Sequence, residues 1–106
     1  MNNAGPEIYA VECLDVRFSH HALLRMAQRG ISQTDVMRAL LHGVIVEKYP
    51  EDAPYPSQLL LAWSVQRPLH IVVAKAKELG LCIVITVYIP ESDHWNDGWM
   101  TRREKT

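Results

Sequence analysis

The sequence has no excess of charge of one sign. Its 11 Lys and Arg residues are balanced by 12 Asp and Glu residues, which gives a net charge of −1 when the histidines are neutral. This balance argues against a protein that coats nucleic acid with its whole surface, although a local basic patch remains compatible with it.

Long apolar segments and export signals are also missing. Polar residues interrupt every apolar run well before the roughly 20 residues of a bilayer-spanning helix. The first residues, MNNAGPEIYA, have no basic start followed by an apolar block, so we expect no export and no membrane association. The only two cysteines, Cys13 and Cys82, are far apart in the sequence, and we expect reduced thiols in the cytoplasm rather than a disulfide bond.

Motifs for metal and phosphate chemistry are absent as well. The five histidines show no ligand spacing such as His-Glu-x-x-His, and neither cysteine belongs to a Cys-x-x-Cys pair. There is no Gly-rich phosphate loop and no Gly-x-Ser-x-Gly elbow. We therefore expect neither a metal site nor a cofactor.

The residues that are present predict one α+β domain. Ser19 and Gly30 are a helix N-cap and a helix stop, and a second helix is predicted from Ser32 to Gly43. After Gly43 the apolar pattern becomes strand-like. Four strands are predicted, over residues 44–49, 59–65, 69–75 and 81–88.

Short links between these strands indicate an antiparallel meander. The predicted fold is therefore an N-terminal pair of helices packed on a four-stranded antiparallel sheet. We divide the chain into a partly mobile N-terminal segment (1–17), the domain (18–103) and a tail (104–106). The pattern over residues 8–16 fits a short strand or a helical turn, and both remain open.

Two groups of polar residues stand out as a candidate site. One edge of the first helix carries His21, Arg25 and Arg29, and guanidinium groups match phosphate oxygens in two-point contacts. On the third strand, alternation places His70, Val72 and Ala74 on one face. A solvated helix face and a hydrogen-bonded core histidine are the structural alternatives.

The fourth strand supplies possible partners for His70. Regular alternation would place Cys82, Val84, Thr86 and Tyr88 on one face. If Lys75 pairs with Leu81, His70 lies opposite Thr86, and Tyr88 is its diagonal neighbour. Farther on, Trp95 and Trp99 are interpreted as a pair that seals the core.

A series of short motifs follows in order along the chain. They are His21-Ala22-x-x-Arg25-Met26-x-x-Arg29-Gly30-Ile31, Gly43, Tyr49-Pro50, Tyr55-Pro56-Ser57, Arg67-Pro68-Leu69-His70-Ile71-Val72, Ile85-Thr86-Val87-Tyr88-x-Pro90, Trp95 and Arg102-Arg103. Together they resemble the family called domain of unknown function 4258, over about residues 18–103.

The resemblance implies a fold similar to the RelE-like ribonuclease toxins of bacterial toxin–antitoxin pairs, by analogy of element order. It implies a small antitoxin as partner, and RNA or the ribosome as target, with no role for DNA. The family's recurrent polar positions fall on His21, Arg25, Arg29, His70, Thr86, Tyr88, Arg102 and Arg103.

Two hypotheses of different class follow. The first is a metal-independent endoribonuclease, with His21, His70, Tyr88 and Arg25 as catalytic residues and Arg29, Thr86, Arg102 and Arg103 as substrate-binding residues. The second is a protein-binding module without enzymatic activity. The first hypothesis requires that the helix edge and the middle of the sheet face a shared cleft.

Overall fold

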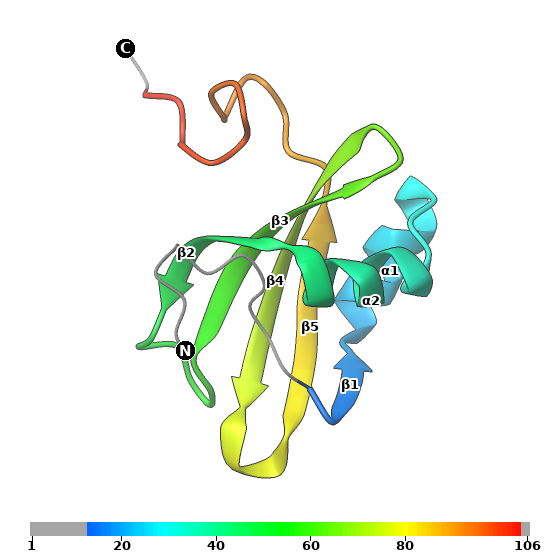
Figure 1. Cartoon of the computed structure of the whole chain (residues 1–106), viewed down its shortest axis with the longest axis vertical. Coiled ribbons are helices and arrows are strands. Elements are labelled where there is room, and N and C mark those ends of the chain that lie inside the picture. The colour runs from blue at the N-terminus through cyan, green and yellow to red at the C-terminus, as the bar shows by residue number, and fades with distance from the viewer. Residues whose placement is uncertain (1–12, 105–106) are drawn as a thin grey trace, which may run out of the picture.

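The computed structural model of the protein describes residues 13–104 (Figure 1). Its elements in chain order are β1 (Asp15–Phe18), α1 (His20–Arg29), α2 (Gln33–His42), β2 (Val44–Tyr49), β3 (Ser57–Ser64), β4 (Arg67–Ala76), the short 3-10 helix η1 (Lys77–Leu79) and β5 (Leu81–Tyr88). Our predictions for residues 1–12 lie outside the described residues. The α+β class and both helices are confirmed.

The sheet has five strands rather than four, and it is mixed. Its order is β1-β5-β4-β3-β2, in which β1 runs parallel to β5 and every other pair is antiparallel. The prediction left residues 8–16 open between a short strand and a helical turn. β1 has only four residues, in which exposed Asp15 and Arg17 alternate with half-buried Val16 and Phe18, and so short an alternation does not identify a strand. Its pairing with β5 depends on contacts distant in sequence.

Local capping explains where the helices begin and end. The Ser19 hydroxyl accepts a hydrogen bond from the Ala22 amide at 2.9 Å, and Gly30 ends α1 with a φ of 69°, which favours glycine. Ser32 and Asp35 form a capping box at the start of α2. These interactions are local, and for that reason the sequence indicated them correctly.

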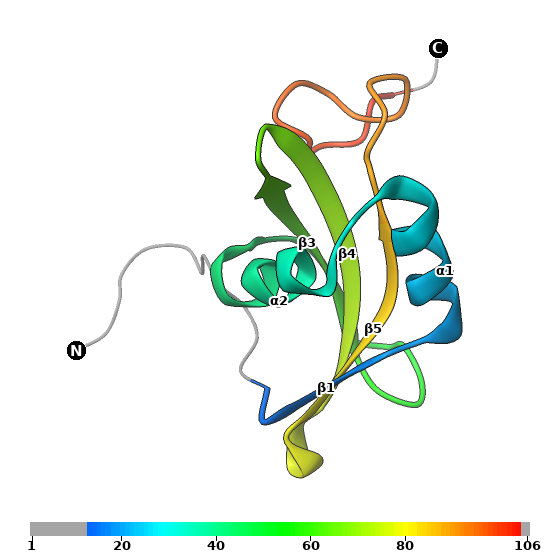
Figure 2. The same ribbon diagram turned by 90° about the vertical axis from the view of Figure 1, so that its right-hand side faces the viewer.

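The helices cover one face of the sheet (Figure 2). α1 packs along β5 and α2 packs on β3. The core between them contains residues from both helices and from one side of the strands, among them Met26, Val36, Leu60, Ile71 and Val84. Leu59, Leu61 and His70 are buried on the opposite face of the sheet, which the helices do not cover.

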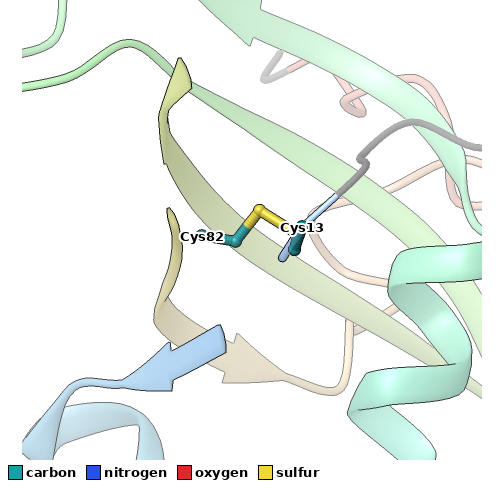
Figure 3. The surroundings of a disulfide bond; sticks show 2 residues. All are labelled: Cys13 and Cys82. Atoms are coloured by element: carbon teal, nitrogen blue, oxygen red, sulfur yellow. A yellow bond between two sulfur atoms is a disulfide. The ribbon is translucent and has the colours of Figure 1, made fainter. Parts of the chain in front are cut away.

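The structure contains a disulfide bond between Cys13 and Cys82, so the expectation of two reduced thiols is wrong (Figure 3). The parallel pairing of β1 with β5 accounts for it. Because Val16 pairs with Cys82, the segment just before β1 passes the beginning of β5, where the Leu14 amide also donates to the Gly80 carbonyl at 2.8 Å. The sequence separation of 69 residues concealed this proximity.

Reduction of this disulfide should destabilise the protein. Cross-links that close long loops restrict the unfolded chain, and losing one costs about 2–5 kcal/mol. We expect the urea midpoint to fall when a thiol reductant is added. The Cys13→Ser variant should match the reduced wild type and should not respond to the reductant. Equal midpoints for oxidised and reduced wild type would contradict this prediction.

Candidate functional site

His70 lies at the base of the candidate site. Its side chain, on β4, is completely buried. Nε2 lies 2.8 Å from the Trp99 carbonyl oxygen, and Nδ1 lies 3.1 Å from the Tyr88 hydroxyl. A carbonyl oxygen can only accept a hydrogen bond, so Nε2 carries the proton and Nδ1 accepts from the Tyr88 hydroxyl. The imidazole thereby joins β5 to the C-terminal segment.

Aromatic rings surround this imidazole and keep it neutral. The Trp95 ring lies edge-on at a centroid distance of 4.4 Å, and the Tyr88 ring lies at 5.2 Å. Burial lowers the pKa of His70. The hydrogen bond to the Trp99 carbonyl opposes this effect, and the positive charge of Arg102 adds to it. A neutral, doubly hydrogen-bonded histidine is suited to positioning its neighbours.

A β-bulge in β5 places Tyr88 beside His70. Val73 pairs with Val84 but Val72 pairs with Thr86, so Ile85 is an extra residue in β5. The bulge reverses the alternation, because Val84 faces the helices whereas Thr86 and Tyr88 face the opposite side with His70. Two predictions are therefore wrong: the four alternating residues of β5 do not share one face, and His70 pairs with Tyr88 rather than with Thr86.

A second bulge, in β2, brings a carboxylate to the same face. Ile45 pairs with Leu60 but Glu47 pairs with Leu59, so Val46 is the extra residue. Ile45 packs against the helix-side core. Without the bulge Glu47 would point in the same direction as Ile45, but the extra residue turns Glu47 and Tyr49 to the His70 face.

Arg102 connects these strands to the C-terminal segment. Its Nη2 donates to Glu47 Oε1 at 2.9 Å, and its guanidinium lies 4.7 Å from the centroid of the Trp95 ring. The Tyr49 hydroxyl donates to the same Glu47 oxygen at 2.6 Å. These hydrogen bonds, that from Tyr49 first and that from Arg102 second, lower the pKa of Glu47, whereas burial raises the pKa of Tyr49 to about 12.

An open cavity of about 820 Å³ lies next to this cluster. Its lining residues are mainly polar and come from α1, the end of β5 and the C-terminal segment. They are Arg29, Tyr88, Ile89, Glu91, Asp93, His94, Trp95, Arg102, Arg103 and Glu104. Three guanidinium groups therefore border one hollow, together with three carboxylates that keep the local charge mixed.

The structure brings only some of the predicted site residues together. His70, Tyr88 and Arg102 form one cluster, and Arg29 and Arg103 line the adjacent cavity. Thr86 shares the face of Tyr88 but does not line the cavity. The prediction that the Trp pair seals the core is confirmed for Trp95, which is 3% exposed; Trp99 contributes its backbone carbonyl to His70.

The predicted cleft shared by the helix edge and the sheet is wrong as stated. α1 packs on the helix side of the sheet, whereas His70 faces the other side. Only Arg29, the last residue of α1, reaches the cavity. His21 lies two turns earlier, about 12 Å along the helix axis. His21 and Arg25 are exposed, and the Arg25 guanidinium donates to Gln28.

Sequence reasoning missed Glu47 and Tyr49. The sequence did indicate that Glu47 and Tyr49 share one face of the strand VIVEKY, because they are two residues apart. It did not indicate which face of the sheet they occupy, because the bulge at Val46 determines that face. Among residues 13–104, no cluster of three or more His, Cys, Asp or Glu side chains is arranged to bind a metal. None of the helices within residues 13–104 has the length and apolar character that crossing a membrane requires.

These observations define a class: a small α+β domain with a polar, aromatic-lined site on the face of its sheet that the helices leave free. Residues 18–89 match the family model described as "Domain of unknown function (DUF4258)", and the chain belongs to this family. The match ends before Trp95, Arg102 and Arg103. No curated protein and no solved structure matches the chain.

The buried imidazole predicts a pH effect on stability. The pKa of folded His70 lies below the value of 6.5 expected when it is unfolded. As the pH falls below 6.5, the unfolded state binds a proton that the folded state does not, so stability decreases by up to about 1.4 kcal/mol per pH unit. Between pH 6.5 and about 5, before carboxylates titrate, His70→Gln should flatten this slope in urea unfolding.

The matched control is His42→Gln, which removes an exposed imidazole at the end of α2. It should keep the slope of the wild type. Equal slopes for the wild type and His70→Gln would contradict the assignment.

Proposed function

We propose that this protein is a metal-independent endoribonuclease that acts as the toxin of a toxin–antitoxin pair. The observation that carries the proposal is the pair of bulges, which turn polar residues of β2 and β5 toward one face, beside a cavity bordered by three arginines. Bulges often re-aim side chains next to active sites. The similarity of the family's element order to that of RelE-like toxins suggests the same function, by analogy.

The arginines would bind the phosphodiester. Arg29, Arg102 and Arg103 line the cavity, and guanidinium groups stabilise the charge that develops on phosphorus oxygens during cleavage. Because Glu91, Asp93 and Glu104 lie among them, the positive surface is small. This arrangement fits the net charge of −1 and favours contact with a short RNA segment over a broad nucleic-acid surface.

Tyr88 would protonate the leaving oxygen. Its ring lines the cavity, and burial raises the pKa of its phenol, so the hydroxyl stays protonated at neutral pH. His70 would act as a positioning residue, since its Nδ1 holds the Tyr88 hydroxyl while its own ring is closed off from solvent. The cleft between the helix edge and the sheet that the first hypothesis required is not formed, so His21 and Arg25 have no part in this proposal. The cavity lined by Arg29, Tyr88, Arg102 and Arg103 takes the place of that cleft.

An RNA substrate and an antitoxin partner would place this activity in the cytoplasm. The Cys13–Cys82 disulfide is more typical of oxidising compartments. Activity should therefore be measured with the disulfide intact and, in parallel, after its reduction.

RNA cleavage by the purified protein tests the proposal. We expect cleavage of single-stranded RNA, alone or on ribosomes, that persists in EDTA. Removing a general acid typically slows a reaction about 10²–10⁴-fold, so Tyr88→Phe should lose activity by at least the lower factor. Arg38→Ala, an exposed change on α2, should cleave at the wild-type rate. No cleavage in either format, or cleavage abolished by EDTA, would refute the proposal.

Induced expression tests the role as a toxin. Wild-type protein should arrest bacterial growth, and Tyr88→Phe at the same expression level should not. Co-expression of the adjacent gene's product should restore growth if it is the antitoxin. If both the wild type and Tyr88→Phe arrest growth, the toxicity does not depend on proton donation by Tyr88, and the proposed mechanism is contradicted.

One observation favours the second candidate, a protein-binding module without enzymatic activity. Both helices present large apolar side chains to solvent: Leu23 and Leu24 on α1, and Met37 and Leu41 on α2, are 41–62% exposed. Under this alternative, Leu41→Glu would abolish capture of a partner protein, while Tyr88→Phe would leave every phenotype unchanged.

A further inference from the structure

We propose that Glu47 is the general base of the reaction, the group that accepts the proton of the attacking 2′-hydroxyl. This inference rests on the proposed ribonuclease function and adds a residue to it. RNA cleavage without a metal needs a proton acceptor as well as a donor. His70 is closed off from solvent and both of its ring nitrogens are occupied, so the acceptor must be another group.

Glu47 does not line the cavity itself, but it is bonded to a residue that does. The bulge at Val46 turns its carboxylate to the face that carries His70 and Tyr88. It is hydrogen-bonded to Arg102, which lines the cavity, and its side chain is 41% exposed. The 2.9 Å hydrogen bond places the carboxylate directly beside the Arg102 guanidinium. Burial is the main cause of the raised pKa of Tyr88; the positive charge of Arg102 lowers that pKa and the negative charge of Glu47 raises it.

The hydrogen bonds of Glu47 fix the orientation of its carboxylate but leave some of its acceptor positions free. The Tyr49 hydroxyl and the Arg102 guanidinium both donate to Oε1, at 2.6 and 2.9 Å. Each carboxylate oxygen offers two lone pairs, and no described hydrogen bond ends on Oε2. One oxygen is therefore fixed by the protein, and the other is available to a substrate hydroxyl.

The carboxylates that line the cavity are held less firmly in place than Glu47, and so they are less suited to act as a general base. Glu91, Asp93 and Glu104 are exposed residues of the C-terminal segment, and Glu91 lies 3.8 Å from the exposed His94 ring. Glu47, by contrast, is on a strand of the sheet and has two hydrogen-bond donors. Supporting hydrogen bonds and a rigid element are what hold a catalytic group in productive geometry.

The proposed step balances in atoms and charge. Glu47 takes the proton of the 2′-hydroxyl, and the 2′-oxygen forms a bond to phosphorus as the bond from phosphorus to the 5′-oxygen breaks. The Tyr88 hydroxyl turns away from His70 Nδ1 and gives its proton to that 5′-oxygen. The products are a 2′,3′-cyclic phosphate and a 5′-hydroxyl, after which protonated Glu47 and the Tyr88 phenolate exchange a proton through water.

The pH dependence of kcat/KM on a labelled single-stranded RNA tests this assignment. The wild-type rate should fall on the acid side as the base becomes protonated. Glu47→Gln should reduce the rate at neutral pH about 10²–10⁴-fold and should lose this acid limb. Glu47→Asp should keep the limb with partial activity. Glu78→Gln, a change on the exposed η1 helix, is the matched control and should behave like the wild type.

Tyr49→Phe provides a second, independent measurement. The hydrogen bond from Tyr49 is the leading cause of the lowered pKa of Glu47. Without it the pKa of the carboxyl rises, and the midpoint of the acid limb should move to higher pH while the rate well above that pH is largely kept. A group that served only to hold the structure would not produce this shift.

The outcomes separate the two claims. If the wild type does not cleave RNA, the proposed function fails and this inference fails with it. If the wild type cleaves RNA but Glu47→Gln, shown to be folded by circular dichroism, keeps the acid limb, only the inference is overturned. A limb that is lost in Glu91→Gln instead would overturn it as well, by assigning the base to the C-terminal segment.

Discussion

The buried imidazole of His70 is the interaction on which the rest of the site depends. Its Nδ1 accepts a hydrogen bond from the Tyr88 hydroxyl of β5, and its Nε2 donates to the Trp99 carbonyl in the C-terminal segment. The Trp95 ring packs against it. A polar ring removed from water is tolerated only when its hydrogen bonds are satisfied, and here both are. The bond to the Trp99 carbonyl and the packing of Trp95 hold the C-terminal segment on the sheet, and with it Arg102. The histidine is buried and positions the residues around it, whereas Tyr88 and Arg102 line the cavity.

Two irregularities of the sheet turn polar residues to the face that carries His70. Regular alternation would turn Glu47 and Tyr88 toward the helices, where the apolar core has no room for them. One extra residue in β2 and one in β5 turn both side chains to the other face. Arg102 then binds the carboxylate and lies on the Trp95 ring, so that acid, cation and phenol meet at one end of the sheet.

Much of the fold was predictable because its signals are local. Ser19, Gly30 and the Ser32–Asp35 capping box fix the two helices, and apolar runs mark the four longer strands close to their observed bounds. For the site, the expectation that His70 and Tyr88 lie close together agrees with their hydrogen bond. Their pairing was wrong by two positions along β5, because the strands first pair at Ala76–Leu81 and the bulge at Ile85 adds another residue. Helix residues His21 and Arg25 were chosen for their chemistry, but they lie on the wrong side of the sheet.

The sequence by itself determined the class of the fold, the extent of its helices and longer strands, and membership in the DUF4258 family. These follow from capping, periodicity and motif order, which act over a few neighbouring residues. Tertiary structure alone decided the parallel strand β1, the Cys13–Cys82 disulfide and the meeting of Glu47, His70, Tyr88 and Arg102. Each of these joins segments distant along the chain, and each depends on strand register, which a single inserted residue reverses.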